Sequence, residues 1–249
     1  MRRKKKIIDL LNDPIDRRKS PHVPGTDIKV SLESLQRLRP GDTDKAWLDT
    51  DLIDAYFELL NLRKVRQAAD CAVPKSIKLK CVFMGTYFIQ KLKSATEKEC
   101  NEILRCFKKL FDGGGLLTME LDKVFIPIQS NLHWTLTVIN FRNKRLEYYD
   151  SFKGPARNGR SFLKSLKEYM EWESRTLKLP FNWKDEKWEM TNTVAEVDVP
   201  TQTNGVDCGV FMCKYADCHS QDLPFSFVQE DINKIRYRMA TEIVDNYVP

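Results

Sequence analysis

The sequence reads QTNGVDCG at residues 202–209 and VFMCKYADC at residues 210–218. A polar loop with an Asn-Gly pair therefore meets an apolar helix at Cys208. The free N–H groups and partial positive charge of a helix N-terminus favour the thiolate, which is the reactive form of cysteine. We predict that Cys208 is a nucleophile and that Gly209 lets a substrate backbone come close. We expect Asp207 to point away from the sulfur and to cap the helix.

A thiol nucleophile needs a base, and the chain has only three histidines. His133 opens the predicted strand 133–141, and a turn at 142–144 leads into a second strand that ends at Asp150. This hairpin returns Asp150 to the sheet edge where His133 lies, so we predict that His133 is the base and that Asp150 orients it. Gln202 is a candidate oxyanion donor beside the Cys208 N–H, since it lies on the same loop.

Each of these residues has a structural alternative. A single histidine on a strand is more often structural than catalytic, an aspartate at a strand end is commonly a turn residue, and a cysteine in an apolar helix commonly behaves as a small hydrophobe. Cys213, Cys218 and His219 superficially suggest zinc, but they lie on one helix without a second pair of ligands. We therefore expect no metal and no cofactor.

The rest of the chain predicts an α+β fold with helices around a central, largely antiparallel sheet. The expected strands are Asp27–Val30, Cys81–Met84, Val124–Ile128, His133–Phe141, Lys144–Asp150 and Trp188–Val197. The first expected helix has its N-cap at Ser31 and ends at Leu38, and the second has its N-cap at Asp49 or Thr50. The other expected helices are Tyr87–Leu92, Glu97–Leu110, Gly159–Arg175, Cys208–Cys218 and Asp231–Val244.

The net charge of +6 is concentrated at one end of the chain. Residues 1–20 carry a net +5, so the other 229 residues carry only +1 and show no signature of a nucleic-acid binder. We divide the chain into a basic tail or linker at 1–25 and a single domain at 26–249. The basic tail is a nuclear-localisation segment, a segment that binds an anionic surface, or a solvated tail without a specific partner. Seven irregularly spaced cysteines indicate reduced thiols in an intracellular protein, and no apolar run is long enough for a membrane span.

Four short motifs resemble the ubiquitin-like-protein-specific proteases, the Ulp/SENP family of cysteine proteases. They are His133-Trp134, Tyr148-Tyr149-Asp150-Ser151, Gln202-(five residues)-Cys208-Gly209, and Cys213-Lys214-Tyr215-Ala216-Asp217. The resemblance implies a papain-like fold in which helices flank a central mixed sheet. It also implies a hydrolase that cleaves after the C-terminal Gly-Gly of SUMO, both in precursors and in lysine-linked conjugates. We expect a monomer in the nucleus or nuclear envelope, and also in the cytoplasm.

The resemblance further implies a substrate tunnel roofed by Trp47 and Trp134. A Gly-Gly tail has no side chains, so flat indole rings can close over it and exclude bulkier sequences. The alternative for Trp134 is core packing. Asp49 and Asp51 are candidates for contact with a basic face of the modifier, although the family's Leu-Asn-Asp pattern is replaced here by Leu48-Asp49-Thr50-Asp51. Their alternative is favourable placement at a helix N-terminus.

Three other functions stay open at this stage. The same chemistry on another modifier, as a deneddylase or deubiquitinase, is favoured by the departure at Asp49-Thr50-Asp51. An inactive module that binds modified proteins is disfavoured by the complete set of candidate residues. An acyltransferase on a related scaffold is disfavoured by the two tryptophans, which suit a peptide tail better than a small acyl donor.

Overall fold

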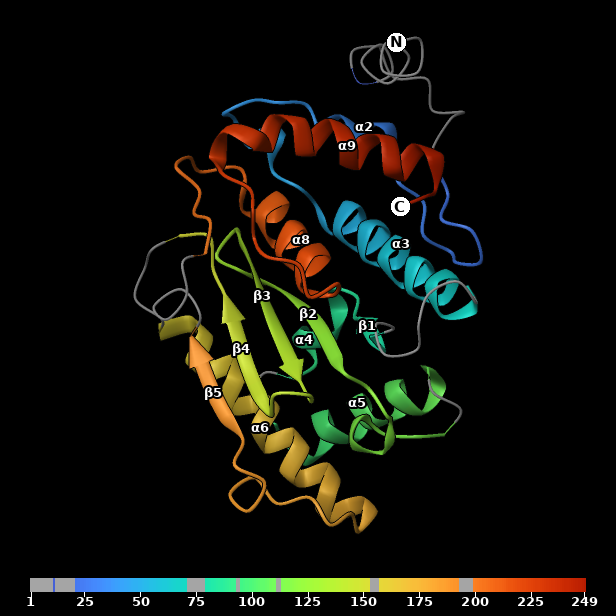
Figure 1. Cartoon of the computed structure of the whole chain (residues 1–249), viewed down its shortest axis with the longest axis vertical. Helices are drawn as coiled ribbons and strands as arrows, with labels where there is room; N and C mark the ends of the chain where they lie inside the picture. Colours follow the sequence, from blue (N-terminus) through green and yellow to red (C-terminus); the bar gives the residue numbers. More distant parts are fainter. Residues whose placement is uncertain are drawn as a thin grey trace.

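The structure of this chain is a computed structural model that describes residues 11, 21–70, 79–92, 95–110, 113–152, 157–192 and 199–249. Its centre is a mixed sheet in the order β1-β2-β3-β4-β5 (Figure 1). The strands are β1 (Cys81–Phe83), β2 (Lys123–Ser130), β3 (His133–Asn140), β4 (Arg145–Tyr149) and β5 (Glu189–Asn192). The central pairs β2–β3 and β3–β4 are antiparallel, whereas the outer pairs β1–β2 and β4–β5 are parallel.

Helices cover both faces of this sheet (Figure 1). The α-helices of the described residues are α2 (Leu32–Gln36), α3 (Thr50–Ala69), α4 (Tyr87–Gln90), α5 (Glu97–Leu110), α6 (Arg157–Leu177), α8 (Cys208–His219) and α9 (Ile232–Asp245). Short 3-10 turns lie at Asp44–Ala46, Leu116–Thr118 and Gln229–Asp231. The helices α3, α8 and α9 pack on one face, and α4, α5 and α6 pack on the other.

Side chains along each strand point alternately to the two faces of the sheet, and a hydrophobic core lies on each face. On β2, Phe125 faces the core with α3 and α8, whereas Val124 and Ile126 face the core with α5 and α6. Successive strand residues point to opposite faces, so apolar residues in a continuous run can serve both cores. Trp183 and Trp188 pack into the second core.

The predicted fold class is confirmed, and most element boundaries agree within two residues or so. Helix α5 has the predicted bounds, and Ser31 and Asp49 cap α2 and α3 by accepting hydrogen bonds from Ser34 N and Leu52 N. The predicted strand Asp27–Val30 was wrong: that segment forms only an isolated bridge between His22 and Lys29. The last part of the predicted strand Trp188–Val197 lies outside the described residues.

The predicted basic tail, 1–25, lies mostly outside the described residues. Two of its described side chains, Leu11 and Val23, are each 1% exposed and belong to the core formed with α3, α8 and α9. The backbone of Pro21 also accepts a hydrogen bond from Val30 N at 2.9 Å. Apolar residues in this segment therefore pack against the domain, and the division at residue 25 stays a prediction.

Candidate active site

His133 and Asp150 meet at one edge of the sheet because β3 and β4 are antiparallel. His133 is the first residue of β3, and Asp150 directly follows the last residue of β4. The Nε2 atom of His133 lies 2.6 Å from Oδ1 of Asp150, and both side chains are about one-fifth exposed. The same carboxylate oxygen accepts a hydrogen bond from Phe152 N at 2.9 Å, and the Phe152 ring lies against the imidazole.

The surroundings of His133 favour its protonated form. Burial alone would lower its pKa, but the hydrogen bond to Asp150, a hydrogen bond to the Cys208 thiol and the charges of both groups raise the pKa from 6.5 to about 9. Because Nε2 faces Asp150, Nδ1 is the ring atom available to the thiol. The sheet edge therefore presents an imidazolium between a carboxylate and a sulfur.

Cys208 is the first residue of α8 and is 3% exposed. Its own N–H lies in the first turn, where a helix has no internal acceptor for it. Helix α8 packs directly on β3, which brings its N-terminus to the end of the sheet that carries His133. The N-terminus of α8 and the imidazole of His133 thus both lie beside this sulfur.

Gln202 is buried on the loop before α8, and its amide is held in one orientation. Its Nε2 donates to Asn204 O at 2.6 Å, and its Oε1 accepts a hydrogen bond from Ser151 Oγ. A rotated amide would place Oε1 against the Asn204 carbonyl, so the observed orientation is the favourable one. One Nε2 hydrogen remains for a further acceptor. Ser151 directly follows Asp150 and links the two loops.

Asp207 holds the N-cap position of α8, but its side chain accepts no capping hydrogen bond from the helix. Its carboxylate instead accepts hydrogen bonds from Arg236 of α9 at 2.6 and 2.9 Å, from Asn204 Nδ2 at 2.7 Å and from Gln229 Nε2 at 2.7 Å. The prediction of a cap was wrong because these distant donors compete for the carboxylate. Sequence reasoning had missed Arg236 and Gln229, which no local pattern marks.

The two candidate tunnel tryptophans tie three segments together. Trp47 is partly exposed and donates from Nε1 to Gly205 O at 2.8 Å, on the loop before Cys208. Trp134 is 2% exposed and donates to Leu48 O at 2.8 Å. Trp134 also belongs to the hydrophobic core, as its packing alternative predicts.

The candidate acidic residues differ in what they contact. Asp49 caps α3 and forms an ion pair with Arg37 at 3.2 Å, so its carboxylate already has partners within the chain. Asp51 is exposed in the first turn of α3. The helix-terminus alternative therefore describes Asp49 well, and of the two only Asp51 presents an exposed carboxylate.

Gly209 lies buried in α8 against Leu48. A Cβ atom at this position would meet Leu48 Cβ at 3.0 Å, which is closer than ordinary van der Waals contact. The missing side chain therefore lets α8 approach the segment that carries Trp47. This packing role was not part of the sequence prediction, and the predicted contact of Gly209 with a substrate stays a prediction.

His219 forms a second imidazole–carboxylate pair at the other end of α8. Its Nε2 lies 2.7 Å from Glu147 Oε2, and its Nδ1 lies 2.9 Å from the ammonium of Lys123. Both ring nitrogens therefore have partners, and neither faces a nucleophile. Among the described residues, no three metal-ligating side chains come together, and none of the helices described is long and apolar enough to cross a bilayer.

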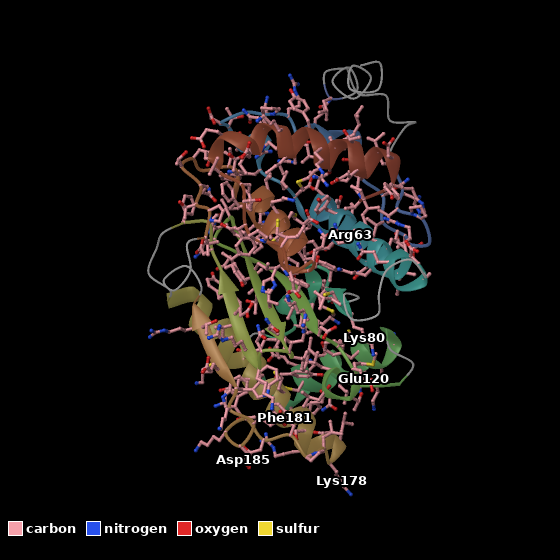
Figure 2. All side chains as sticks on the ribbon, in the orientation of Figure 1. Arg63, Lys80, Glu120, Lys178, Phe181 and Asp185 are labelled. Atoms are coloured by element: carbon pink, nitrogen blue, oxygen red, sulfur yellow. The ribbon has the colours of Figure 1, made fainter. Side chains whose placement is uncertain are left out.

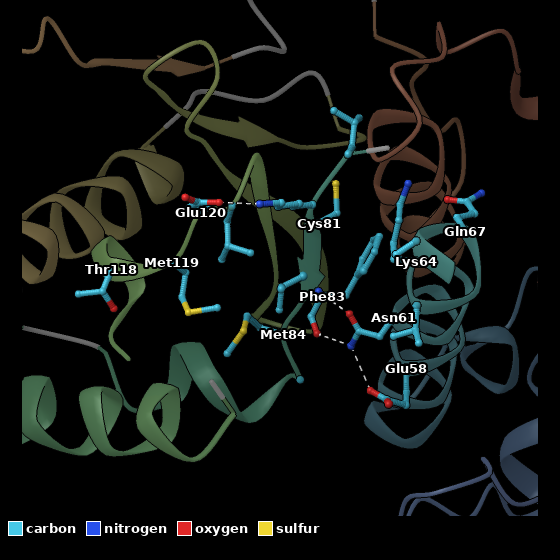
Figure 3. A pocket seen from close by; sticks show the side chains of 17 residues that line it. Glu58, Asn61, Lys64, Gln67, Cys81, Phe83, Met84, Thr118, Met119 and Glu120 are labelled. Carbon is cyan, nitrogen blue, oxygen red and sulfur yellow. Dashed lines mark hydrogen bonds and ion pairs between the residues drawn. The ribbon is translucent and has the colours of Figure 1, made fainter. Parts of the chain in front are cut away.

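A cavity of about 810 Å³ lies at the free edge of β1, between α3 and the turn Leu116–Thr118, and contains none of the candidate residues (Figure 3). Asn61 there bonds both backbone groups of Phe83, at 2.9 and 3.0 Å. Burial raises the pKa of Cys81 in its wall to about 11, and no histidine lines it. Near its rim, the Lys80–Glu120 pair, labelled in Figure 2, is exposed. This cavity offers no nucleophile and base.

Comparison with known proteins gives consistent results. A family model described as the Ulp1 protease family, C-terminal catalytic domain, matches residues 46–248. Ubiquitin-like-specific protease 1A of Arabidopsis thaliana is 36% identical over 222 residues, which are 88% of this chain and 40% of that protein. Sentrin-specific protease 2 of Homo sapiens is 32% identical over 228 residues, or 90% of this chain and 34% of that protein. The chain thus spans well under half the length of these relatives.

A solved structure extends the likeness to the fold. The C-terminal Ulp1 protease domain in complex with Smt3, the yeast ortholog of SUMO, superposes with a TM-score of 0.72 at 22% identity. The superposition covers 98% of this chain and 95% of the other. Because the family model matches residues 46–248 and the fold agrees, this chain belongs to the Ulp1 protease family of cysteine proteases.

Proposed function

We propose that this chain is a cysteine protease that cleaves after the C-terminal Gly-Gly of SUMO, in precursors and in lysine-linked conjugates. The observation that carries the proposal is the alignment of Asp150, His133 and Cys208 at the N-terminus of α8. Family membership supports the reaction class, and the names and complex of the relatives support a modifier of the SUMO type.

The proposed reaction has two halves, the formation of a thioester on Cys208 and its hydrolysis by water. The Cys208 thiolate attacks the carbonyl carbon of the terminal glycine, and the oxyanion accepts hydrogen bonds from Cys208 N–H and Gln202 Nε2. The His133 imidazolium, held by Asp150, donates its Nδ1 proton to the departing lysine amine. Neutral His133 then takes a proton from water, and the water oxygen attacks the thioester carbon. The C–S bond breaks, which restores the Cys208 thiolate beside the imidazolium and releases the modifier as a carboxylic acid that ionises in water.

In the proposed complex, Trp47 and Trp134 close over the Gly-Gly tail. The hydrogen bonds from their indoles to Gly205 O and Leu48 O support this assignment, because they hold the segment that carries Trp47 beside the loop before Cys208. Asp51 and Gly209 are proposed contacts of the modifier. For Asp49, the capping of α3 and the ion pair with Arg37 support an indirect role in positioning the segment that carries Trp47.

Cleavage of a SUMO precursor by purified Cys208→Ala and Cys213→Ala variants tests the reaction. Both cysteines are buried on α8, so Cys213→Ala is a matched control for the loss of one sulfur. We expect Cys208→Ala to abolish cleavage and retain binding, and Cys213→Ala to remain active. Gln202→Ala should lower kcat by roughly 10²- to 10³-fold through the loss of one oxyanion donor. Full cleavage by Cys208→Ala would exclude the proposal.

The identity of the modifier is tested with a panel of C-terminal electrophilic probes, one each for SUMO, ubiquitin and other ubiquitin-like proteins. Selective labelling of Cys208 by the SUMO probe is expected. Preferential labelling by another probe would assign the same chemistry to that modifier. The absence of any labelling, together with tight binding of modified proteins, would instead indicate a binding module.

The proposed place of action is inside the cell, in the nucleus or nuclear envelope and also the cytoplasm. The six cysteines among the described residues are all free, which suits a reducing compartment. The basic run Arg2–Lys6 is of the kind that serves as a nuclear-localisation segment. Fluorescence of the tagged chain with and without this run measures the contribution of the run.

A further inference from the structure

We infer that Arg236 of α9 is a positioning residue that holds the nucleophile loop and the segment of Trp47 in a fixed relation. Its guanidinium is 0% exposed and uses four of its five N–H donors within the chain. Nothing in the proposed reaction uses Arg236 directly. This inference rests on the proposed roles of Cys208 and Trp47.

The first set of contacts reaches the residues immediately before the nucleophile. Arg236 Nε and Nη2 donate to Asp207 Oδ1 at 2.9 and 2.6 Å, and Nη2 also donates to Val206 O at 3.1 Å. Both the side chain of Asp207 and the backbone carbonyl before it are thereby oriented. Because Cys208 follows directly, the start of α8 is set from α9.

The second set of contacts reaches the segment that carries Trp47. Arg236 Nη1 donates to Arg37 O at 2.9 Å. The Arg37 side chain in turn donates to Trp47 O at 3.2 Å and pairs with Asp49 at 3.2 Å. The indole of Trp47 then bonds Gly205 O at 2.8 Å, on the nucleophile loop.

These contacts form a closed ring through α9, the nucleophile loop and the segment 37–49. The planar guanidinium of arginine has three donor nitrogens in fixed directions and can satisfy acceptors on two segments at once, whereas the ammonium of lysine has only one donor atom. The closed ring therefore requires arginine at position 236. Small displacements of reacting groups can cost about 100-fold in rate, so loss of this guanidinium should lower kcat even in a variant that remains folded.

The test compares Arg236→Lys and Arg236→Met with Arg238→Met. Arg238 lies on the same helix, its side chain is 53% exposed, and it forms an ion pair with Glu242. Arg238→Met therefore controls for the loss of a cation from α9. All variants are assayed far below their melting temperatures, and folding is checked by circular dichroism. We expect kcat to fall by roughly 10- to 100-fold in Arg236→Met, less in Arg236→Lys, and to stay unchanged in Arg238→Met, with a smaller change in KM.

Alkylation of Cys208 by iodoacetamide, measured by mass spectrometry on its peptide, gives a readout that needs no modifier. The positioning role predicts at least a fivefold slower alkylation in folded Arg236→Lys than in the wild type. If the wild type cleaves no modifier, the proposed function fails while this readout still tests the positioning role. Folded Arg236→Lys with kcat and alkylation rate both within twofold of the wild type would overturn the inference, even where Arg236→Met does not fold.

Discussion

Replacement of Asp150 by asparagine should remove the main support of the charged form of His133. Asparagine keeps the size of the side chain but carries no charge, so the imidazole loses the charge and the ionic hydrogen bond of Asp150. We expect the pKa of His133 to fall clearly below about 9 in Asp150→Asn, because burial still lowers it and only the contacts with Cys208 still raise it. Cleavage should fall steeply, since the imidazole loses both its orientation and its charge.

The rise in the pKa of His133 sets the size of the effect on stability. The difference between 6.5 and about 9 corresponds to roughly 3 kcal/mol of stabilisation of the imidazolium in the folded protein. A pKa raised by folding contributes stability that is fully present below the unfolded value, near 6.5, and is lost as the pH rises through about 9. The free energy of unfolding of the wild type should therefore fall by up to about 3 kcal/mol across this window relative to Asp150→Asn.

The assay combines histidine NMR with urea unfolding at pH 6 and pH 9. The chain has three histidines, so the signals of His133 are assigned with a single His133→Gln variant. The signals of His219 should keep their wild-type behaviour, which makes them an internal control. Glu189→Gln breaks an exposed ion pair with Arg145 and controls for loss of one surface carboxylate. A His133 pKa near 9 in Asp150→Asn would refute the reasoning.

Two further predictions concern packing and a buried carboxylate. Gly209→Ala should destabilise the fold by about 1–2 kcal/mol in urea unfolding, since the clash with Leu48 outweighs the gain in helix propensity. Leu48→Ala removes the Cγ and Cδ1 contacts at 3.2 Å but keeps the Cβ contact at 3.0 Å, so it should relieve only part of the clash. Fully additive losses in the double variant would contradict this argument. Glu173→Ala should cost about 2–5 kcal/mol, because the carboxylate accepts from Leu116 N and Leu117 N at 2.8 and 2.7 Å. The exposed Glu189→Gln should cost less than about 1 kcal/mol, and a similar loss in both variants would disprove the argument.

The candidate pair His133 and Asp150 could be predicted from sequence because their approach depends on a local rule. Two strands joined by a tight turn are antiparallel, so the start of one and the end of the next share an edge. The start of α8 at Cys208 followed from a local change of composition in the same way. These features need only the order of residues within about 20 positions of one another.

The support of the site could not be predicted in this way, since its contacts join distant segments. Arg236 contacts the carbonyl of Arg37, 199 residues earlier, and Asp207, 29 residues earlier. The prediction that Asp207 caps α8 failed for that reason: local preference favours a cap, but a buried guanidinium bonds the carboxylate more strongly. Gly209 likewise depends on Leu48, which no short motif connects to it.

The two imidazole–carboxylate pairs show what separates a candidate base from a structural histidine. His133 and His219 each lie within 2.7 Å of a carboxylate oxygen, so the carboxylate alone does not distinguish them. The second ring nitrogen does: in His219 it meets the Lys123 ammonium, a cation that needs an acceptor, whereas in His133 it is the atom left for a thiol. An imidazole whose two nitrogens are bonded to permanent charges of the fold has no proton to exchange with a substrate. Proton transfer therefore requires a partner whose own charge changes during the reaction, and at these two pairs only His133 has one, in Cys208.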